Sequence, residues 1–187
     1  MQRSPFALLL AAGMTLGVLT SASAPASAAG DVTIEIVTSM GTIEAVVDPV
    51  HAPVTTKNFL KNVDRKFYFG GSFFRSIPGF VIQGGNKTKE TPGDVPIVLE
   101  APIKTGLKNV DGALSMARRN DPNSGTSEFF ICDGDQARLD GTDATSGYAV
   151  FGHVTKNMDL VRKIAHLPGQ DQYLMNPVTI VRIVRKP

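Results

Sequence analysis

Two polar side chains stand inside an apolar stretch of the sequence, where together they could bind a peptide group. The stretch is Phe73–Gly85, FFRSIPGFVIQGG, and the two side chains are Arg75 and Gln83. A guanidinium offers five N–H donors in a fixed planar fork and stays charged, so it can stabilise an amide without transferring a proton. The simpler alternative is an edge-strand arginine that points to water, because a buried arginine is costly unless it is paired or opens onto a site.

Local sequence pattern predicts the strands and the turn on which these two side chains lie. Pro78-Gly79 is a strong turn dipeptide, so the stretch is predicted to be two short strands joined at this turn. A tight two-residue turn would place Arg75 and Phe80 on one face of the hairpin and Gln83 on the other. A bulge or a wider turn would be needed to bring all three to one face.

The rest of the chain is predicted to be mostly short strands. Eighteen Gly and twelve Pro indicate many turns, and the strands are not separated by regularly alternating helices. Pattern alone therefore predicts an antiparallel barrel or sandwich. Further strands are predicted at 31–38, 42–47, 97–99, 112–117, 127–132, 148–155 and 177–185, and helices at 53–64 and at 157–167, where Asn157 could supply the N-cap.

Length and charge limit the possible classes of function. The chain has 187 residues, 42% hydrophobic and 19% charged, which suits one ordinary globular domain. Its formal net charge is +2, and residues 1–28 contain one charged group, Arg3, so the remainder carries +2 − 1 = +1. A nearly neutral domain gives no reason to expect nucleic acid or an acidic membrane surface as a partner. We expect a monomer.

Residues 1–29 have the pattern of a cleaved signal peptide. Arg3 precedes the apolar run Phe6–Leu19, and small residues follow, ending in Ala26-Ser27-Ala28. The run is shorter than the roughly 20 apolar residues that a membrane span needs, so no stable membrane anchor is expected. Cleavage after Ala28 or Ala29 would leave 30–187 as the mature domain. Export to the periplasm is expected, with secretion from the cell as the alternative.

The sequence gives no sign of a disulfide or a metal site. Cys132 is the only cysteine, and it ends the apolar run Phe129–Cys132, which favours a buried, unreactive thiol. The three histidines, His51, His153 and His166, have no ligand-like spacing. We therefore predict no metal and no cofactor.

Three blocks of sequence, in this order, resemble the cyclophilins, the cyclophilin-type peptidyl-prolyl cis-trans isomerases. They are Phe73–Gly85, then Ala113–Cys132 (ALSMARRNDPNSGTSEFFIC), then Leu139-Asp140-Gly141 followed by Tyr148–Gly152 (YAVFG). The resemblance runs from about Asp31 to Ile164. It implies a mainly β fold, a closed eight-stranded antiparallel barrel with an α-helix covering each open end.

The resemblance also implies an activity and its substrates. A cyclophilin accelerates rotation about X-Pro bonds, here in proline-containing unfolded or exported polypeptides, and so assists their folding. The barrier is about 18–20 kcal/mol because amide resonance is lost, whereas the two isomers differ by only ~0.5–1 kcal/mol. No energy source or cofactor is needed. A binding module or holdase without turnover, and a secreted structural β-domain, are the alternatives; Arg75 favours the isomerase, because a pure binder would not need it.

Site residues are carried over from the resemblance one by one. It gives catalytic roles to Arg75, which would stabilise the twisted amide, and to Phe80 and Gln83. Backbone at Ala117 and Arg118 would hold the peptide extended. The remaining substrate-binding positions form the apolar pocket or its rim, and they are Val81, Phe130 and Leu139 for the pocket and Glu128, Arg138 and Tyr148 for the rim.

Four rim positions differ from the best-known cyclophilin pattern. Arg118 stands in place of Asn, Glu128 in place of Gln, Arg138 in place of the Trp usual in eukaryotic members, and Tyr148 in place of His. Glu128 is expected either to lean to the rim and favour basic substrates or to be a solvated carboxylate with no role. Cyclosporin, a ligand of this family, is expected to bind weakly, because Arg138 lacks the apolar face of Trp.

Overall fold

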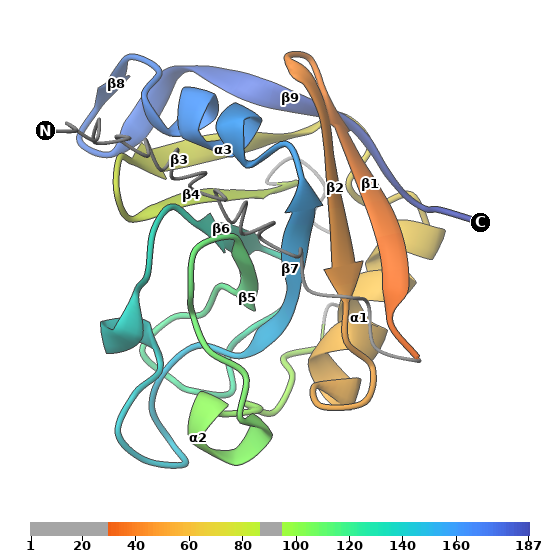
Figure 1. The fold of residues 1–187 in the computed structure, drawn as a ribbon, viewed down its shortest axis with the longest axis vertical. Helices are drawn as coiled ribbons and strands as arrows, with labels where there is room; N and C mark the ends of the chain where they lie inside the picture. The colour runs from red at the N-terminus through yellow and green to blue at the C-terminus, as the bar shows by residue number, and fades with distance from the viewer. Residues whose placement is uncertain (1–29, 87–94) are drawn as a thin grey trace, which may run out of the picture.

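Most of the predicted strands form one antiparallel sheet in the computed structural model, which describes residues 30–86 and 95–187 (Figure 1). In these ranges the strands are β1 (Val32–Thr38), β2 (Gly41–Val47), β3 (Gly71–Ile77), β4 (Val81–Gly85), β5 (Ala113–Met116), β6 (Phe129–Cys132), β7 (Val150–Lys156), β8 (Gly169–Gln170) and β9 (Tyr173–Arg185). Their order is β1-β2-β7-β5-β6-β4-β3-β9-β8, and β1 also pairs with β9. The eight strands other than β8 therefore close into the expected barrel.

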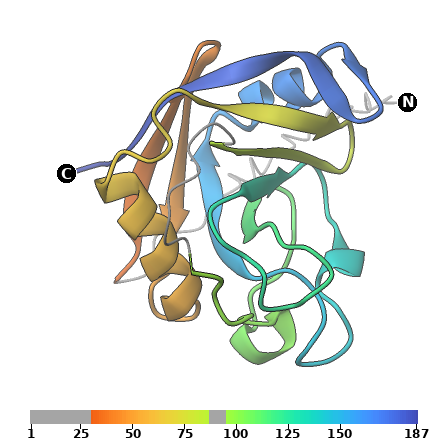
Figure 2. The ribbon, with the colours of Figure 1, turned by 180° about the vertical axis from the view of Figure 1, so that it is seen from behind.

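Two helices lie against this barrel at well-separated places (Figures 1 and 2). The first, α1 (Pro53–Asp64), has the predicted bounds and contacts β7 and β9, whereas α3 (Met158–Ala165) contacts β2, β3 and β4. Both contribute buried side chains to one hydrophobic cluster, which fills the barrel. The interior is rich in aromatic rings, and the largest fully buried ones belong to Phe59, Tyr68, Phe73, Phe129 and Phe151.

The start of α1 is completed by a residue from a distant loop. Ala52 at the N-cap position makes no side-chain cap, which leaves the first N–H groups of the helix without a local acceptor. Both oxygens of Glu100 take this role: Oε1 accepts from the backbone N of Val54 at 2.9 Å and Oε2 from that of Thr55 at 2.8 Å. A carboxylate at this end is also favoured by the helix dipole.

Several predicted elements differ from the structure. Residues 97–99 are not a strand: only Ile97 forms an isolated bridge, with Gly125. Asn157 does not cap α3 through its side chain, because its Nδ2 donates instead to the backbone O of Thr42 at 2.7 Å. The last strand begins four residues before the predicted 177, at Tyr173, because its first part pairs with the unpredicted β8. Two short helices were also not predicted, and they are α2 (Pro102–Thr105) and the 3₁₀ helix η1 (Ala137–Leu139).

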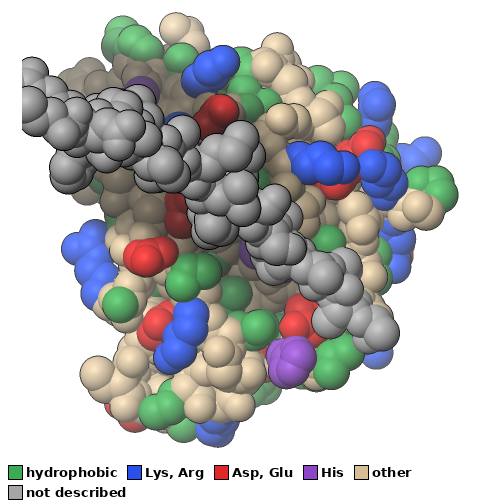
Figure 3. All heavy atoms as spheres, viewed as in Figure 1, with side chains coloured by type: hydrophobic (Ala, Val, Ile, Leu, Met, Phe, Trp, Pro, Cys, Tyr) green, Lys and Arg blue, Asp and Glu red, His purple; other side chains and the backbone are tan. Residues whose placement is uncertain are grey.

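The surface carries charges of both signs. Acidic and basic side chains are interspersed on the face shown in Figure 3, which agrees with the nearly neutral composition. In the two described ranges, no helix is long and apolar enough to cross a membrane. The predicted signal peptide, residues 1–29, lies outside the described residues.

Candidate active site

The hairpin of β3 and β4 brings Arg75 and Gln83 to one face by means of a wider turn. Ile77 pairs with Val81 and Arg75 pairs directly with Gln83, so three residues, not two, link the strands. The backbone N of Phe80 donates to the O of Ile77 at 3.0 Å, and φ of Gly79 is 70°. Proline followed by a residue with positive φ is typical of a type II turn, a conformation that favours glycine. Cross-strand partners share a face, so this turn places the two polar side chains together.

A bulge in β3 then turns Arg75 out of the core. The register shifts between Phe73, which pairs with Gly84, and Arg75, so Phe74 is the extra residue of this strand. Without the bulge, Arg75 would lie on the same face as Phe73, which is fully buried. Gly84 permits the packing below, because a Cβ there would lie 2.7 Å from the Phe73 ring.

A pocket of about 160 Å³ lies over this hairpin. Its apolar wall includes Phe130 and Tyr148, whose rings meet edge to face with centroids 5.5 Å apart. Nine residues line the pocket, all of them predicted site residues, and they are Arg75, Phe80, Val81, Gln83, Ala117, Arg118, Phe130, Leu139 and Tyr148. The other two predicted residues, Glu128 and Arg138, lie beside it.

Arg75 is held from two sides by amide oxygens. Its Nη1 donates to Oε1 of Gln83 at 3.1 Å, and both Nε and Nη2 donate to Oε1 of Gln172, at 3.1 and 2.6 Å. Of the five guanidinium N–H groups these bonds use three, which leaves two for a ligand. The arginine is therefore oriented before a substrate arrives.

Gln172 is a site residue that the sequence did not reveal. It lies 97 positions from Arg75, in the two-residue turn between β8 and β9. Asp171 and Gln172 both have positive φ, at 51° and 71°, as a type I′ hairpin turn requires. The usual signal for this turn is Asn-Gly or Asp-Gly, and Asp-Gln does not match it.

Glu128 acts on Arg75 through Gln83. Oε2 of Glu128 accepts a hydrogen bond from Nε2 of Gln83 at 2.8 Å. A carboxylate only accepts, so it fixes the amide with its nitrogen toward Glu128 and its oxygen toward Arg75. The sequence placed this carboxylate near Arg75, and in the structure the amide of Gln83 bridges the two charges.

The other charged rim residues lie against aromatic rings. The guanidinium of Arg118 lies 4.6 Å from the Tyr148 ring centroid, and its Nε donates to the backbone O of Gly147 at 2.9 Å. The guanidinium of Arg138, which is exposed, lies 4.2 Å from the Phe80 ring centroid. Both contacts are within cation–π range, so these two cations are placed around the pocket by its own aromatic groups.

A second hollow of about 270 Å³ continues from the pocket. It shares Gln83, Ala117 and Arg118 with the first and is lined also by Glu128 and Arg119. The backbone N of Ala117 donates to the O of Glu128 at 2.9 Å, so this N–H is not available to bind a peptide. A bound chain that leaves the pocket on this side would meet both an acidic and a basic side chain.

The described residues include no metal-binding group and no reactive cysteine. No cluster of three or more His, Cys, Asp or Glu among them could hold a metal ion. Cys132 is buried, and burial, followed by the nearby charge of Asp140, raises the pKa of its thiol to about 12. The thiol is therefore protonated at neutral pH.

Comparisons with known proteins point to one family. The family model described as cyclophilin type peptidyl-prolyl cis-trans isomerase/CLD matches residues 33–185. The chain is 41% identical to peptidyl-prolyl cis-trans isomerase A of Dickeya dadantii, over 87% of this chain and 86% of that protein. It is 43% identical to a peptidyl-prolyl cis-trans isomerase of Acinetobacter baylyi, over 89% and 90%.

Solved structures agree with these sequence relatives. A cyclophilin type peptidyl-prolyl cis-trans isomerase of Cryptosporidium parvum superposes with a TM-score of 0.73 at 25% identity, covering 84% of this chain and 98% of its own. The same protein solved in the presence of the dipeptide Ala-Pro gives a TM-score of 0.72 at 25% identity, covering 83% and 99%.

Proposed function

The chain belongs to the cyclophilin-type peptidyl-prolyl cis-trans isomerases and is an isomerase of that kind, and from this premise we propose how its pocket acts. The apolar wall, which includes Phe80, Phe130 and Leu139, holds the proline ring of the substrate. Arg75 donates its two remaining N–H groups to the amide as it twists. Holding one side of the X-Pro bond while the other turns requires no proton transfer and no cofactor.

The position of Arg75 is the observation that carries this proposal. Its guanidinium lies at the edge of an apolar pocket, already bound by Gln83 and Gln172. A donor fixed in advance stabilises the twisted amide more than the planar one without being reorganised during the reaction. A hydrogen bond from a charged group contributes about 1.5–3 kcal/mol, which corresponds to about 10- to 150-fold in rate.

We further propose that the substrates are exported, proline-containing polypeptides. The support is the signal-peptide pattern of residues 1–29, with its Ala26-Ser27-Ala28 cleavage motif. Folding of such chains is slowed by X-Pro isomerisation, which takes tens to hundreds of seconds without a catalyst. Fusing residues 1–29 to a reporter that is active only outside the cytoplasm tests this; a reporter that stays inactive would contradict export.

The mechanism is tested by measuring isomerisation of an Ala-Pro peptide by the domain 30–187 and by two arginine variants. Arg75→Ala is expected to lower kcat/KM by about 10- to 150-fold with the fold intact. Arg182→Ala is the matched control, because Arg182 is an exposed arginine of β9 that does not line the pocket. Near-normal turnover by folded Arg75→Ala would overturn the proposed role.

A further inference from the structure

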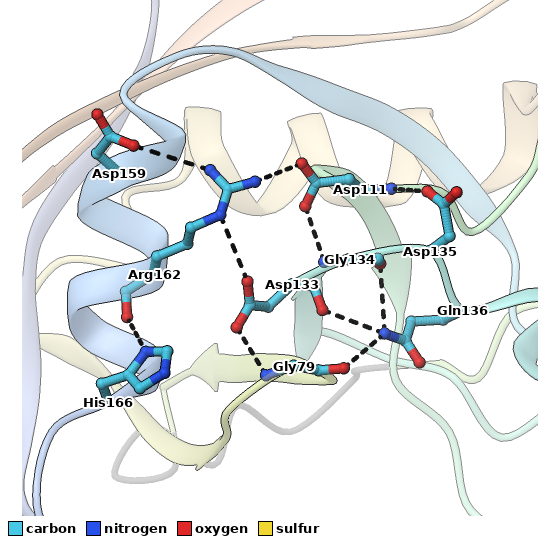
Figure 4. Close-up of polar contacts among 9 residues, drawn as sticks. All are labelled: Gly79, Asp111, Asp133, Gly134, Asp135, Gln136, Asp159, Arg162 and His166. Carbon is cyan, nitrogen blue, oxygen red and sulfur yellow. Dashed lines mark hydrogen bonds and ion pairs between the residues drawn. The ribbon is translucent and has the colours of Figure 1, made fainter.

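The turn that carries Phe80 is tied to one four-residue segment, Asp133–Gln136, which follows β6 (Figure 4). The backbone N of Gly79 donates to Oδ2 of Asp133 at 2.8 Å, and the backbone O of Gly79 accepts from Nε2 of Gln136 at 2.9 Å. The backbone O of Phe80 accepts from the N of Asp133 at 2.9 Å. These three bonds add to the turn's own bond between Phe80 and Ile77.

Asp133 is buried although it is a carboxylate. It is only 6% exposed, and a buried charge is costly unless it is paired and hydrogen-bonded. Its partners are the N–H of Gly79 on one oxygen and, on the other, Nε of Arg162 at 3.8 Å. Arg162 belongs to α3, so this carboxylate lies between a helix of the barrel and the turn of the hairpin.

The same arginine also holds the segment itself. Nη2 of Arg162 contacts Oδ2 of Asp111 at 2.6 Å, and Oδ1 of Asp111 accepts from the backbone N of Gly134 at 2.8 Å. Oδ1 of Asp135 accepts in turn from the backbone N of Asp111 at 2.9 Å. The segment that binds the turn is therefore held by Asp111 at the two residues that follow Asp133 (Figure 4).

We infer that Asp133 is a positioning residue for isomerisation: with Gln136, it fixes the turn Pro78–Phe80 and so sets the place of the Phe80 ring in the wall of the pocket. The inference rests on the pocket proposed above. Asp133 does not line the pocket and acts only through the backbone of the turn. A shift of the turn would move the Phe80 ring relative to the rest of the pocket wall and so weaken its contact with the proline ring.

The inference makes a distinctive kinetic prediction. A displaced pocket wall weakens the hold on the proline ring in the planar and the twisted state alike, which raises KM more than it lowers kcat. Asp133→Ala, which removes a charged hydrogen bond to the turn, is expected to raise KM about tenfold, with kcat changed less. Asp133→Asn keeps an acceptor oxygen for the N–H of Gly79 and is expected to restore most of the wild-type KM.

Two controls separate this role from general stability. Asp159→Asn removes a charged partner of Arg162, whose Nη1 lies 3.9 Å from Oδ1 of Asp159, without touching the segment or the turn, and it is expected to leave KM unchanged. Hydrogen exchange at the amide of Gly79 is expected to become at least about tenfold faster in Asp133→Ala, while the amide of Ile36 in β1 keeps its wild-type rate.

The outcomes are decisive in each case. If folded Asp133→Ala has the wild-type KM, or if Asp133→Asn is as impaired as Asp133→Ala, the inference is wrong. If Asp133→Ala does not fold, Gln136→Ala is measured instead. A severalfold rise in KM in that variant would support the inference, and an unchanged KM would overturn it. Phe80→Ala is measured beside them. An unchanged KM in this variant would overturn the proposed role of the pocket. If its KM rises, a negative result with the Asp133 variants overturns only the role of Asp133.

Discussion

A single oxygen atom, Oε1 of Gln172, accepts hydrogen bonds from both Nε and Nη2 of Arg75, at 3.1 and 2.6 Å. With Gln83 on Nη1, the guanidinium is bound on two sides by groups that only orient it and do not neutralise its charge. An arginine held in this way has already lost much of its rotamer freedom before a substrate binds. The turn between β8 and β9 therefore orients an arginine of the candidate site.

Gln172→Ala is expected to lower kcat by about fivefold with little change in KM. The variant frees Arg75 to leave its oriented position, and for an exposed partner the lost hydrogen bond is worth about 1 kcal/mol. Gln170→Ala is the matched control, because Gln170 is exposed in the same hairpin. Steady-state kinetics on an Ala-Pro peptide measure the effect, and a wild-type kcat would show that Gln83 alone orients Arg75.

Glu128→Gln is expected to change substrate preference more than catalysis. An amide oxygen at this position can still accept from Nε2 of Gln83, so Arg75 stays oriented, but the negative charge in the second hollow is lost. Peptides with Lys beside the proline should lose their advantage over peptides with Glu. The measurement is the ratio of the two values of kcat/KM; if the ratio does not move, Glu128 does not set specificity.

Arg138→Trp is expected to strengthen inhibition by cyclosporin, which should inhibit the natural sequence weakly. The guanidinium of Arg138 lies over the Phe80 ring, and covering a mobile charged side chain with an apolar cyclic peptide is unfavourable. Titrating the inhibition of both proteins tests this. Tight inhibition of the natural protein would show that Arg138 is no obstacle to the drug.

Stability is expected to fall in acid partly because of Glu44. Hydrogen bonds from Lys156 and then Lys186 lower the pKa of this carboxyl from 4.5 to about 2 in the folded protein. A depressed folded-state pKa means that the stabilisation is complete above 4.5 and is lost as the pH falls toward 2. Urea unfolding between these values should therefore show a weaker pH dependence in Glu44→Gln than in the natural protein; equal slopes would contradict the assignment.

The Phe73–Gly85 hairpin shows what local sequence can and cannot predict. Two short apolar segments and the Pro78-Gly79 turn are signals within one stretch, so both strands and their turn were predicted. The sequence left open whether Gln83 shares a face with Arg75, because one residue more or less in the turn reverses every side chain after it. The three-residue link decided this in the folded chain, and the bulge at Phe74 decided that the pair faces away from the core.

The residues of this chain were enough to predict the family and a mainly β fold with two helices, and the resemblance of three blocks added the closed barrel and eleven candidate site residues, nine of which line one pocket. These features depend on local periodicity or on residue types within three short blocks. The sequence could not show that Gln172 binds Arg75 or that Asp133 contacts the turn before Phe80, because these contacts exist only in the folded chain. Their partners lie 97 and 54 positions away, and no local pattern encodes such a pair. Contacts of this kind form because closure of the barrel brings β9 beside β3 and β6 beside β4. Polar and charged groups that are buried by this closure then need hydrogen-bonding partners.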